Sequence, residues 1–229
     1  MIIYADGIDL EVTIDDSLPA VTPFSGLRVA GHDLATRLES YRGRDDVIVL
    51  ALVLGGVLVG HEVASQLGLP FDYVILRRLF APNGPGFPVC AVNVAGNLEF
   101  VGDVPPRPEV PVTGLDYFLR DTLAQLEERE KICRGGRPPR DLAGKTILLV
   151  DCGMRTGSTM MTAMRAVRSG QPAKLVVAQP VASLGATELV KPEADEFVCL
   201  GYPRPFGNVA VWYKDFTRPE ENQISDLLK

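Results

Sequence analysis

The sequence predicts an α/β protein built on a doubly wound, mainly parallel sheet. Residues 47–67 and 147–169 each show an apolar run, a short glycine-containing loop and a helical pattern, in that order. Both runs, VIVLALV and ILLV, lack alternation, which is typical of parallel strands covered on both faces. Alternating strand and helix patterns follow, and repeated units of this kind build a doubly wound sheet. The further strands are expected at 73–76, 175–179 and 197–200.

The composition and net charge of the chain disfavour several classes of protein. The chain has 229 residues, 46% of them apolar, a net charge of −6 and a pI near 5.0. We find no run long enough to cross a bilayer, and the acidic charge disfavours a nucleic-acid partner, so we expect a cytoplasmic protein without membrane or nucleic-acid contacts. Four widely spaced cysteines and two histidines make a zinc site or a disulfide framework unexpected.

Other segments complete the expected architecture. Residues 1–23 alternate loosely between turn signals and predict a β-hairpin added to a main domain at 24–229. Two short strands at 89–95 and 98–102 precede a helix of about twenty residues, opened by a Thr113 and Asp116 capping pair. Ser183 is expected to cap a later helix, and 209–213 to be extended.

The stretch ILLVDCGMRTGSTM, at 147–160, indicates a ligand site. Asp151 ends the strand, and a loop of Thr156, Gly157, Ser158 and Thr159 opens the next helix. The first amides of a helix lack internal partners and lie at its positive end, so such a loop can bind phosphate. Asp151 can accept hydrogen bonds from sugar hydroxyls or share a magnesium ion.

The sequence lacks the motifs of two other classes of enzyme, the Walker A nucleoside triphosphatases and the α/β hydrolases. The G-K-T at 144–146 precedes a strand and has Pro139 where a Walker A loop needs glycine. An α/β hydrolase needs a G-x-S-x-G elbow, which this sequence lacks.

The 147–160 stretch resembles the motif of the type I phosphoribosyltransferases, in which an apolar strand, two acids and a few residues precede T-G-x-T. That resemblance implies their fold, phosphoribosyl pyrophosphate or a nucleotide as ligand, Mg²⁺ as cofactor and a homodimer. It is supported by the segment at 199–216, CLGYPRPFGNVAVWYKDF, and by R-G-G-R-P-P at 134–139. The substrate-binding residues it implies are Cys152, Gly153, Arg155, Thr156, Gly157, Ser158, Thr159, Leu54, Gly55 and Gly56.

The same resemblance assigns roles. Gly55-Gly56 with Mg²⁺ would hold the pyrophosphate, and Asp151 would hold a ribose hydroxyl and the metal. Arg77 and Arg78, followed by the Pro- and Gly-rich segment 81–86, match a lid that closes over substrate and offsets the pyrophosphate charge. The alternative for that segment is a plain surface connection.

Three positions depart from the family motif. Cys152 stands where the second acid is expected, Leu54 stands where an arginine is expected, and Arg155 occupies a place where some members carry an acid. Cys152 is either a buried space-filling residue or a thiol with a lowered pKa beside a helix N-terminus. Arg155 could bind phosphate bidentately.

Two functions fit these residues. One is transfer of ribose 5-phosphate from phosphoribosyl pyrophosphate to an acceptor, expected to be a nucleobase. The other is a binding protein or regulator that kept the phosphate loop and lost turnover, consistent with Cys152 and Leu54. Phe206 or Trp212 could stack on a base, although core packing is the commoner role of such residues.

Overall fold

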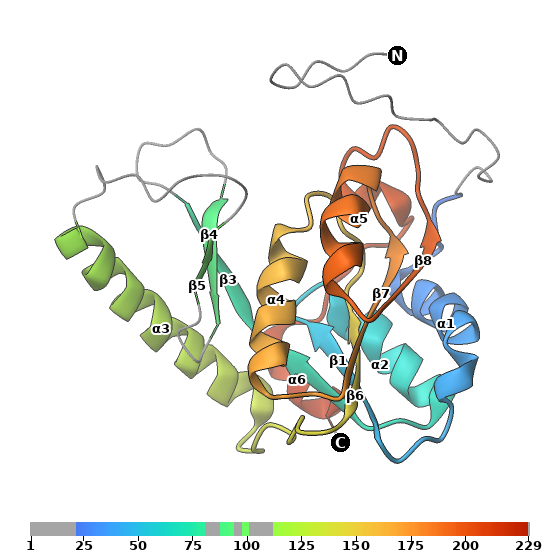
Figure 1. Cartoon of the computed structure of the whole chain (residues 1–229), viewed down its shortest axis with the longest axis horizontal. Coiled ribbons are helices and arrows are strands. Elements are labelled where there is room, and N and C mark those ends of the chain that lie inside the picture. The colour runs from blue at the N-terminus through green and yellow to red at the C-terminus, as the bar shows by residue number, and fades with distance from the viewer. Residues whose placement is uncertain (1–21, 81–87, 94–97, 101–111, 229) are drawn as a thin grey trace.

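A five-stranded parallel sheet forms the centre of the protein (Figure 1). The computed structural model describes residues 22–80, 88–93, 98–100 and 112–228, with side chains at 22–76, 120–220 and 222–228. The strand order is β2-β1-β6-β7-β8, which confirms the doubly wound fold. The expected N-terminal hairpin at 1–23 lies almost entirely outside the described residues. The strands are β1 (Val47–Leu52), β2 (Phe71–Val74), β6 (Thr146–Val150), β7 (Lys174–Val181) and β8 (Glu196–Gly201).

Helices cover both faces of this sheet because successive side chains of a strand point to opposite faces, and both sets are apolar. On β1, Val47 and Val49 join one buried cluster, whereas Ile48 and Leu50 join the other. The first face is covered by α1 (Leu27–Arg37), α2 (Gly56–Leu67) and α6 (Glu221–Leu227), and the second by α4 (Ser158–Ser169) and α5 (Leu184–Val190). Fully burying one such side chain contributes about 1.5 to 3 kcal/mol.

A second, antiparallel sheet stands beside α4 (Figure 1). It contains β3 (Leu76–Phe80), β4 (Pro88–Asn93) and β5 (Leu98–Phe100), and the long helix α3 (Val112–Arg134) follows it. The strand expected at 73–76 is therefore divided at Ile75 between two sheets. Ser183 caps α5 as expected, since its hydroxyl accepts a hydrogen bond from the Ala186 amide at 3.1 Å.

The role of Arg77 and Arg78 at the pyrophosphate stays a prediction, and the structure shows only where their backbone lies. Both lie within β3, where they pair with Val92 and Ala91 of β4. Their side chains and the 81–86 segment lie outside what the structure describes. The side chains of Thr113 and Asp116 also lie outside it, although α3 does begin at Val112.

The C-terminal region differs from the expected extended segment. Residues Val209–Trp212 form a 3-10 helix, η3, because the Asn208 side chain accepts a hydrogen bond from the Ala210 amide at 3.2 Å and begins a turn. Tyr213 then returns to extended backbone and bridges Phe24. The short helix α6 was not predicted, although Glu220 and Gln223 form a capping box at its start.

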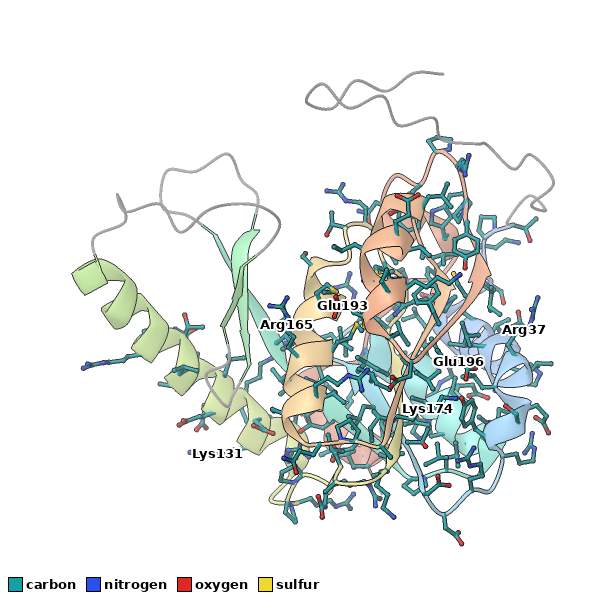
Figure 2. The ribbon with its side chains drawn as sticks, in the orientation of Figure 1. Arg37, Lys131, Arg165, Lys174, Glu193 and Glu196 are labelled. Atoms are coloured by element: carbon teal, nitrogen blue, oxygen red, sulfur yellow. The ribbon has the colours of Figure 1, made fainter. Side chains whose placement is uncertain are left out.

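An ion pair and a hydrogen bond connect side chains at the amino-terminal edge of the sheet, which is opposite the loops discussed below. Lys174 and Glu196 lie together at the starts of β7 and β8 (Figure 2), with 2.6 Å between Nζ and Oε2. The hydroxyl of Tyr41, from the 3-10 helix η1 (Glu39–Tyr41), donates to the same Glu196 oxygen at 2.6 Å. The three groups tie two strands to the first helical layer.

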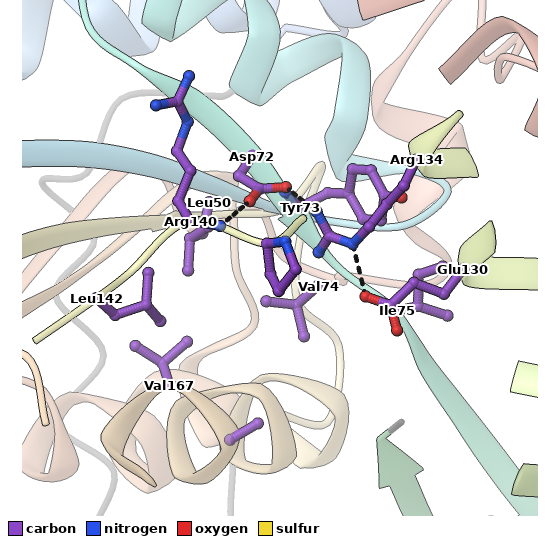
Figure 3. A pocket seen from close by; sticks show the side chains of 12 residues that line it. Leu50, Asp72, Tyr73, Val74, Ile75, Glu130, Arg134, Arg140, Leu142 and Val167 are labelled. Atoms are coloured by element: carbon purple, nitrogen blue, oxygen red, sulfur yellow. Dashed lines mark hydrogen bonds and ion pairs between the residues drawn. The ribbon is translucent and has the colours of Figure 1, made fainter. Parts of the chain in front are cut away.

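A buried ion pair attaches α3 to the edge strand β2 (Figure 3). Arg134 Nη1 lies 2.8 Å from Asp72 Oδ1, and the two side chains are only 9% and 5% exposed. Arg134 also donates to Glu130 at 2.7 Å, and the Arg140 amide donates to Asp72 at 2.9 Å. The R-G-G-R-P-P stretch therefore has a structural role, because its first residue, Arg134, forms this ion pair. The stretch connects α3 to β6 and runs beside a cavity of about 160 Å³.

Replacing Arg134 by alanine is expected to destabilise the fold by about 3 to 5 kcal/mol, because it leaves the buried Asp72 carboxylate without its cation. Urea unfolding would measure the loss. Lys131→Ala, three residues earlier in an exposed pair with Glu128, is the control and should change stability by less than about 1 kcal/mol. Equal effects of the two substitutions would contradict the role of the buried pair.

Candidate functional site

The candidate site lies where the chain diverges from the centre of the sheet. β1 and β6 are neighbours, with Ala51 paired to Val150. From β1 the chain continues to β2 on one side, and from β6 it continues to β7 on the other. Loops leaving the carboxyl ends of two such strands open a crevice, which is the usual ligand position in doubly wound sheets.

The two predicted loops approach each other closely at this point. A Cβ placed on Gly55 would lie 2.5 Å from the Cys152 sulfur, and one on Gly56 would lie 2.8 Å from the Asp151 Cα. These separations are shorter than any ordinary side-chain contact, so only glycine allows the two backbones to meet. Gly55, Gly56, Asp151 and Cys152, which are about a hundred positions apart in the chain, therefore form one site.

The loop before α4 has the geometry of a phosphate cradle. Gly157 has φ of +81°, a conformation that favours glycine, and α4 begins at Ser158 with no side-chain cap on its first amides. The hydroxyls of Thr156 and Ser158 lie 3.1 Å apart. Uncapped amides at the positive end of a helix, with hydroxyl donors beside them, suit an anion.

The Asp151 and Cys152 pair ends β6 with one acid and one thiol. Asp151 Oδ1 accepts a hydrogen bond from the Cys152 amide at 2.7 Å, which orients the carboxylate along the loop. Burial raises the pKa of the Cys152 thiol well above its ordinary value, and the Asp151 carboxylate raises it further. The structure therefore favours a buried, protonated thiol over the alternative of a lowered pKa.

The C-terminal segment packs against the loop that carries Asp151 and Cys152. The Tyr213 hydroxyl donates a hydrogen bond to the Cys152 carbonyl, and Tyr213 is buried between the rings of Phe24 and Phe216. A Cβ on Gly153 would lie 2.9 Å from Val209 Cγ1, so η3 also packs against the loop. Sequence reasoning missed Tyr213, although its place in the W-Y-x-D-F segment was a signal.

The remaining predicted residues surround this centre. Leu54 is half-buried and packs against the α1 and α2 core, and Thr159 is half-buried in the first turn of α4. Arg155 and Thr156 are exposed, and the Arg155 carbonyl accepts a hydrogen bond from Ser183 at 2.6 Å. Trp212 donates its indole N–H to the Phe206 carbonyl at 2.8 Å and packs against the core, which favours a structural role for Trp212.

The fold and this crevice define a class of doubly wound α/β proteins with a candidate ligand site at the carboxyl ends of two central strands, and the comparison with known families identifies the family. The phosphoribosyl transferase domain model matches residues 27–200. The chain therefore belongs to the phosphoribosyl transferase domain family.

Individual relatives support this membership. A Mycobacterium tuberculosis protein provisionally named a phosphoribosyl transferase is 32% identical over 87% of this chain, and the chain spans only 45% of its length. The crystal structure of TT1426 from Thermus thermophilus is 33% identical, with a TM-score of 0.76 over 90% of this chain and 98% of that one. The bifunctional protein PyrR of a Roseiflexus species is 31% identical over 52% of this chain and 61% of its own length.

The part of the chain that the structure describes contains neither a membrane-spanning helix nor a cluster of metal-ligating side chains. None of the helices described here combines the length and apolar character needed to cross a bilayer. In the same residues, no three His, Cys, Asp or Glu side chains gather as a metal cluster.

Gly56→Ala is expected to destabilise the protein by about 1 to 3 kcal/mol, because the added methyl group would overlap Asp151 and force the two loops apart. Thermal unfolding should show this as a fall of roughly 2 to 4 °C per kcal/mol for a chain of this size. Gly185→Ala is the matched control, since nothing lies within 4 Å of a Cβ there and the position is helical. A fall of the same size in Gly185→Ala would contradict the close-approach argument.

Iodoacetamide labelling of Cys152, followed on its peptide by mass spectrometry in Mg²⁺-free buffer, should have a pH midpoint above that of free cysteine. The thiolate is the reacting form, and burial together with Asp151 disfavours it. Asp151→Asn should lower the midpoint by removing one of these two causes. A wild-type midpoint at or below that of free cysteine would restore the activated-thiol hypothesis.

Proposed function

We propose that this chain binds phosphoribosyl pyrophosphate where β1 and β6 end and transfers its ribose 5-phosphate to a nucleobase-like acceptor. The observation that carries the proposal is the packing of Gly55-Gly56 against Asp151 and Cys152, beside the uncapped start of α4. It brings two glycine-containing loops together at the carboxyl ends of adjacent strands, which supports binding of a sugar that carries a phosphate and a pyrophosphate group.

Each loop has a role in this proposal. The amides and hydroxyls of Thr156, Gly157, Ser158 and Thr159 hold the 5-phosphate, and Asp151 accepts a hydrogen bond from a ribose hydroxyl. The backbone of Gly55-Gly56 receives the pyrophosphate. During transfer, the bond from ribose C1 to the pyrophosphate oxygen breaks and its electrons leave with pyrophosphate. A bond from C1 to the acceptor nitrogen forms, and the acceptor gives up its proton.

The donor set of the site fits Mg²⁺, which typically binds one or two carboxylates together with substrate phosphates. Asp151 is the described carboxylate that would hold the ion, with pyrophosphate and ribose oxygens as the other ligands. When bound, Mg²⁺ neutralises charge on the leaving pyrophosphate. A homodimer and a cytoplasmic location stay predictions of the family resemblance.

A second function, a phosphoribosyl-binding regulator without turnover, is favoured by Cys152. A buried, protonated thiol hydrogen-bonds a ribose hydroxyl more weakly than the carboxylate of the family motif does. A lost charged hydrogen bond is worth about 1.5 to 3 kcal/mol, or roughly ten- to over a hundredfold in rate. That loss affects the sugar and leaves the phosphate cradle intact.

Calorimetric titration with phosphoribosyl pyrophosphate should show Mg²⁺-dependent binding. Asp151→Ala and Thr156→Ala should each weaken it about tenfold or more, because each removes one group that contacts the ligand. Ser169→Ala, at the far end of α4, is the control and should bind as the wild type does. Absence of binding in the wild type would refute the proposed function.

The two functions separate in an assay of pyrophosphate release with a panel of nucleobases. Release by the wild type that depends on Asp151 supports the transferase. Release that appears only after Cys152→Asp is combined with Leu54→Arg supports the regulator, since that double variant restores the family motif.

A further inference from the structure

A pyrophosphate group at the Gly55-Gly56 turn needs a cation that the turn does not supply. Residues 53–56 contribute apolar side chains and glycines, and the adjoining side chain at the end of β6 is the Asp151 carboxylate. Several negative charges beside a carboxylate repel one another strongly in a partly buried site. In the proposed function Mg²⁺ offsets part of this charge, and Arg77 and Arg78 are predicted to offset more; a further cation can come from another element of the fold.

Arg218 is a cation on the C-terminal segment that also carries Tyr213. Its guanidinium lies 4.7 Å from the centre of the Phe216 ring. Within the described residues it makes no ion pair and no hydrogen bond, and the side chain is exposed. Stacking on a ring fixes the plane of a guanidinium while leaving its five N–H donors available to an anion.

A series of contacts connects Arg218 to the candidate site. The Phe216 ring packs 5.2 Å from the ring of Tyr213, whose hydroxyl bonds the Cys152 carbonyl. The Cys152 sulfur in turn lies against Gly55. The charge of Arg218 is also felt by the Cys152 thiol, whose pKa it lowers against the larger effect of burial.

We propose that Arg218 binds the pyrophosphate group of phosphoribosyl pyrophosphate, supplying from the C-terminal segment the cation that the Gly55-Gly56 turn lacks. This inference rests on the proposed function for the identity of the ligand. It assigns residues 213–218 a binding role in addition to their packing role, because the rings of Phe216 and Tyr213 connect the guanidinium to the loop that packs against the turn.

Calorimetry on the full chain with three ligands tests the assignment. The ligands are phosphoribosyl pyrophosphate, inorganic pyrophosphate and ribose 5-phosphate, each with Mg²⁺. Arg218→Ala should weaken binding of the two pyrophosphate-containing ligands about ten- to a hundredfold and leave ribose 5-phosphate binding unchanged. Arg218→Lys should restore part of the affinity, since it keeps the charge and loses the planar fork. Arg137→Ala, another exposed arginine, is the control and should match the wild type.

The outcomes distinguish this inference from the proposed function. Phosphoribosyl pyrophosphate binding that is equal in wild type and Arg218→Ala overturns the role of Arg218 and leaves the proposed function standing. Pyrophosphate binding that depends on Arg218, without any binding of phosphoribosyl pyrophosphate, supports Arg218 and refutes the proposed function. Equal losses for all three ligands indicate a structural role and overturn the inference, and absence of binding by every ligand overturns both.

Discussion

The close approach of the loops after β1 and β6 is the constraint on which the candidate site depends. It requires adjacent parallel strands in register, and it requires glycine at 55 and 56, where any side chain would overlap Cys152 or Asp151. Because the chain diverges here, α2 and α4 lie on opposite faces of the sheet and both begin at this edge. Two positive helix ends, one at Gly56 and one at Ser158, therefore flank a single crevice.

The C-terminal segment completes the site from a distant part of the chain. Tyr213 is buried, packs against the rings of Phe24 and Phe216, and hydrogen-bonds the backbone of the loop that carries Asp151. A buried hydrogen bond of this kind contributes about 1 kcal/mol, and its partner would be costly to leave unpaired. The family resemblance at 199–216 thus has a physical basis, since this segment holds the ligand loop in place.

Most of the fold could be predicted from the sequence because local patterns specify it. Unbroken apolar runs gave the buried strands, and the Ser183 cap gave the start of α5. The division of 73–76 between two sheets could not be predicted, since both strands are locally extended and only tertiary packing separates them. Likewise, Asn208 turns 209–212 into a 3-10 helix through one side-chain hydrogen bond that competes with an apolar, strand-like pattern.

The candidate site was predicted unevenly for the same reason. The loop at 156–159 and Gly55-Gly56 could be predicted as candidates because their motifs are continuous in the chain. Tyr213 and Arg218 were not predicted, because Tyr213 contacts the loop through one hydrogen bond and Arg218 contacts the Phe216 ring, and neither contact leaves a spacing rule in the sequence. The basic stretch at 134–140 illustrates the opposite case, since its motif-like spacing is explained by the buried pair between Arg134 and Asp72.

Two of the departures from the family motif remove charges of opposite sign. Cys152 in place of an acid removes one negative charge, and Leu54 in place of arginine removes one positive charge, so these two changes offset one another. Since Cys152 lies against Gly55, the residue after Leu54, both changes fall in one contact region. An uncompensated charge in a partly buried site is costly, so two offsetting changes are easier to accommodate than either one alone. The result is an uncharged contact region with a half-buried Leu54 and a buried Cys152 thiol, which is compatible with the close packing of the two loops.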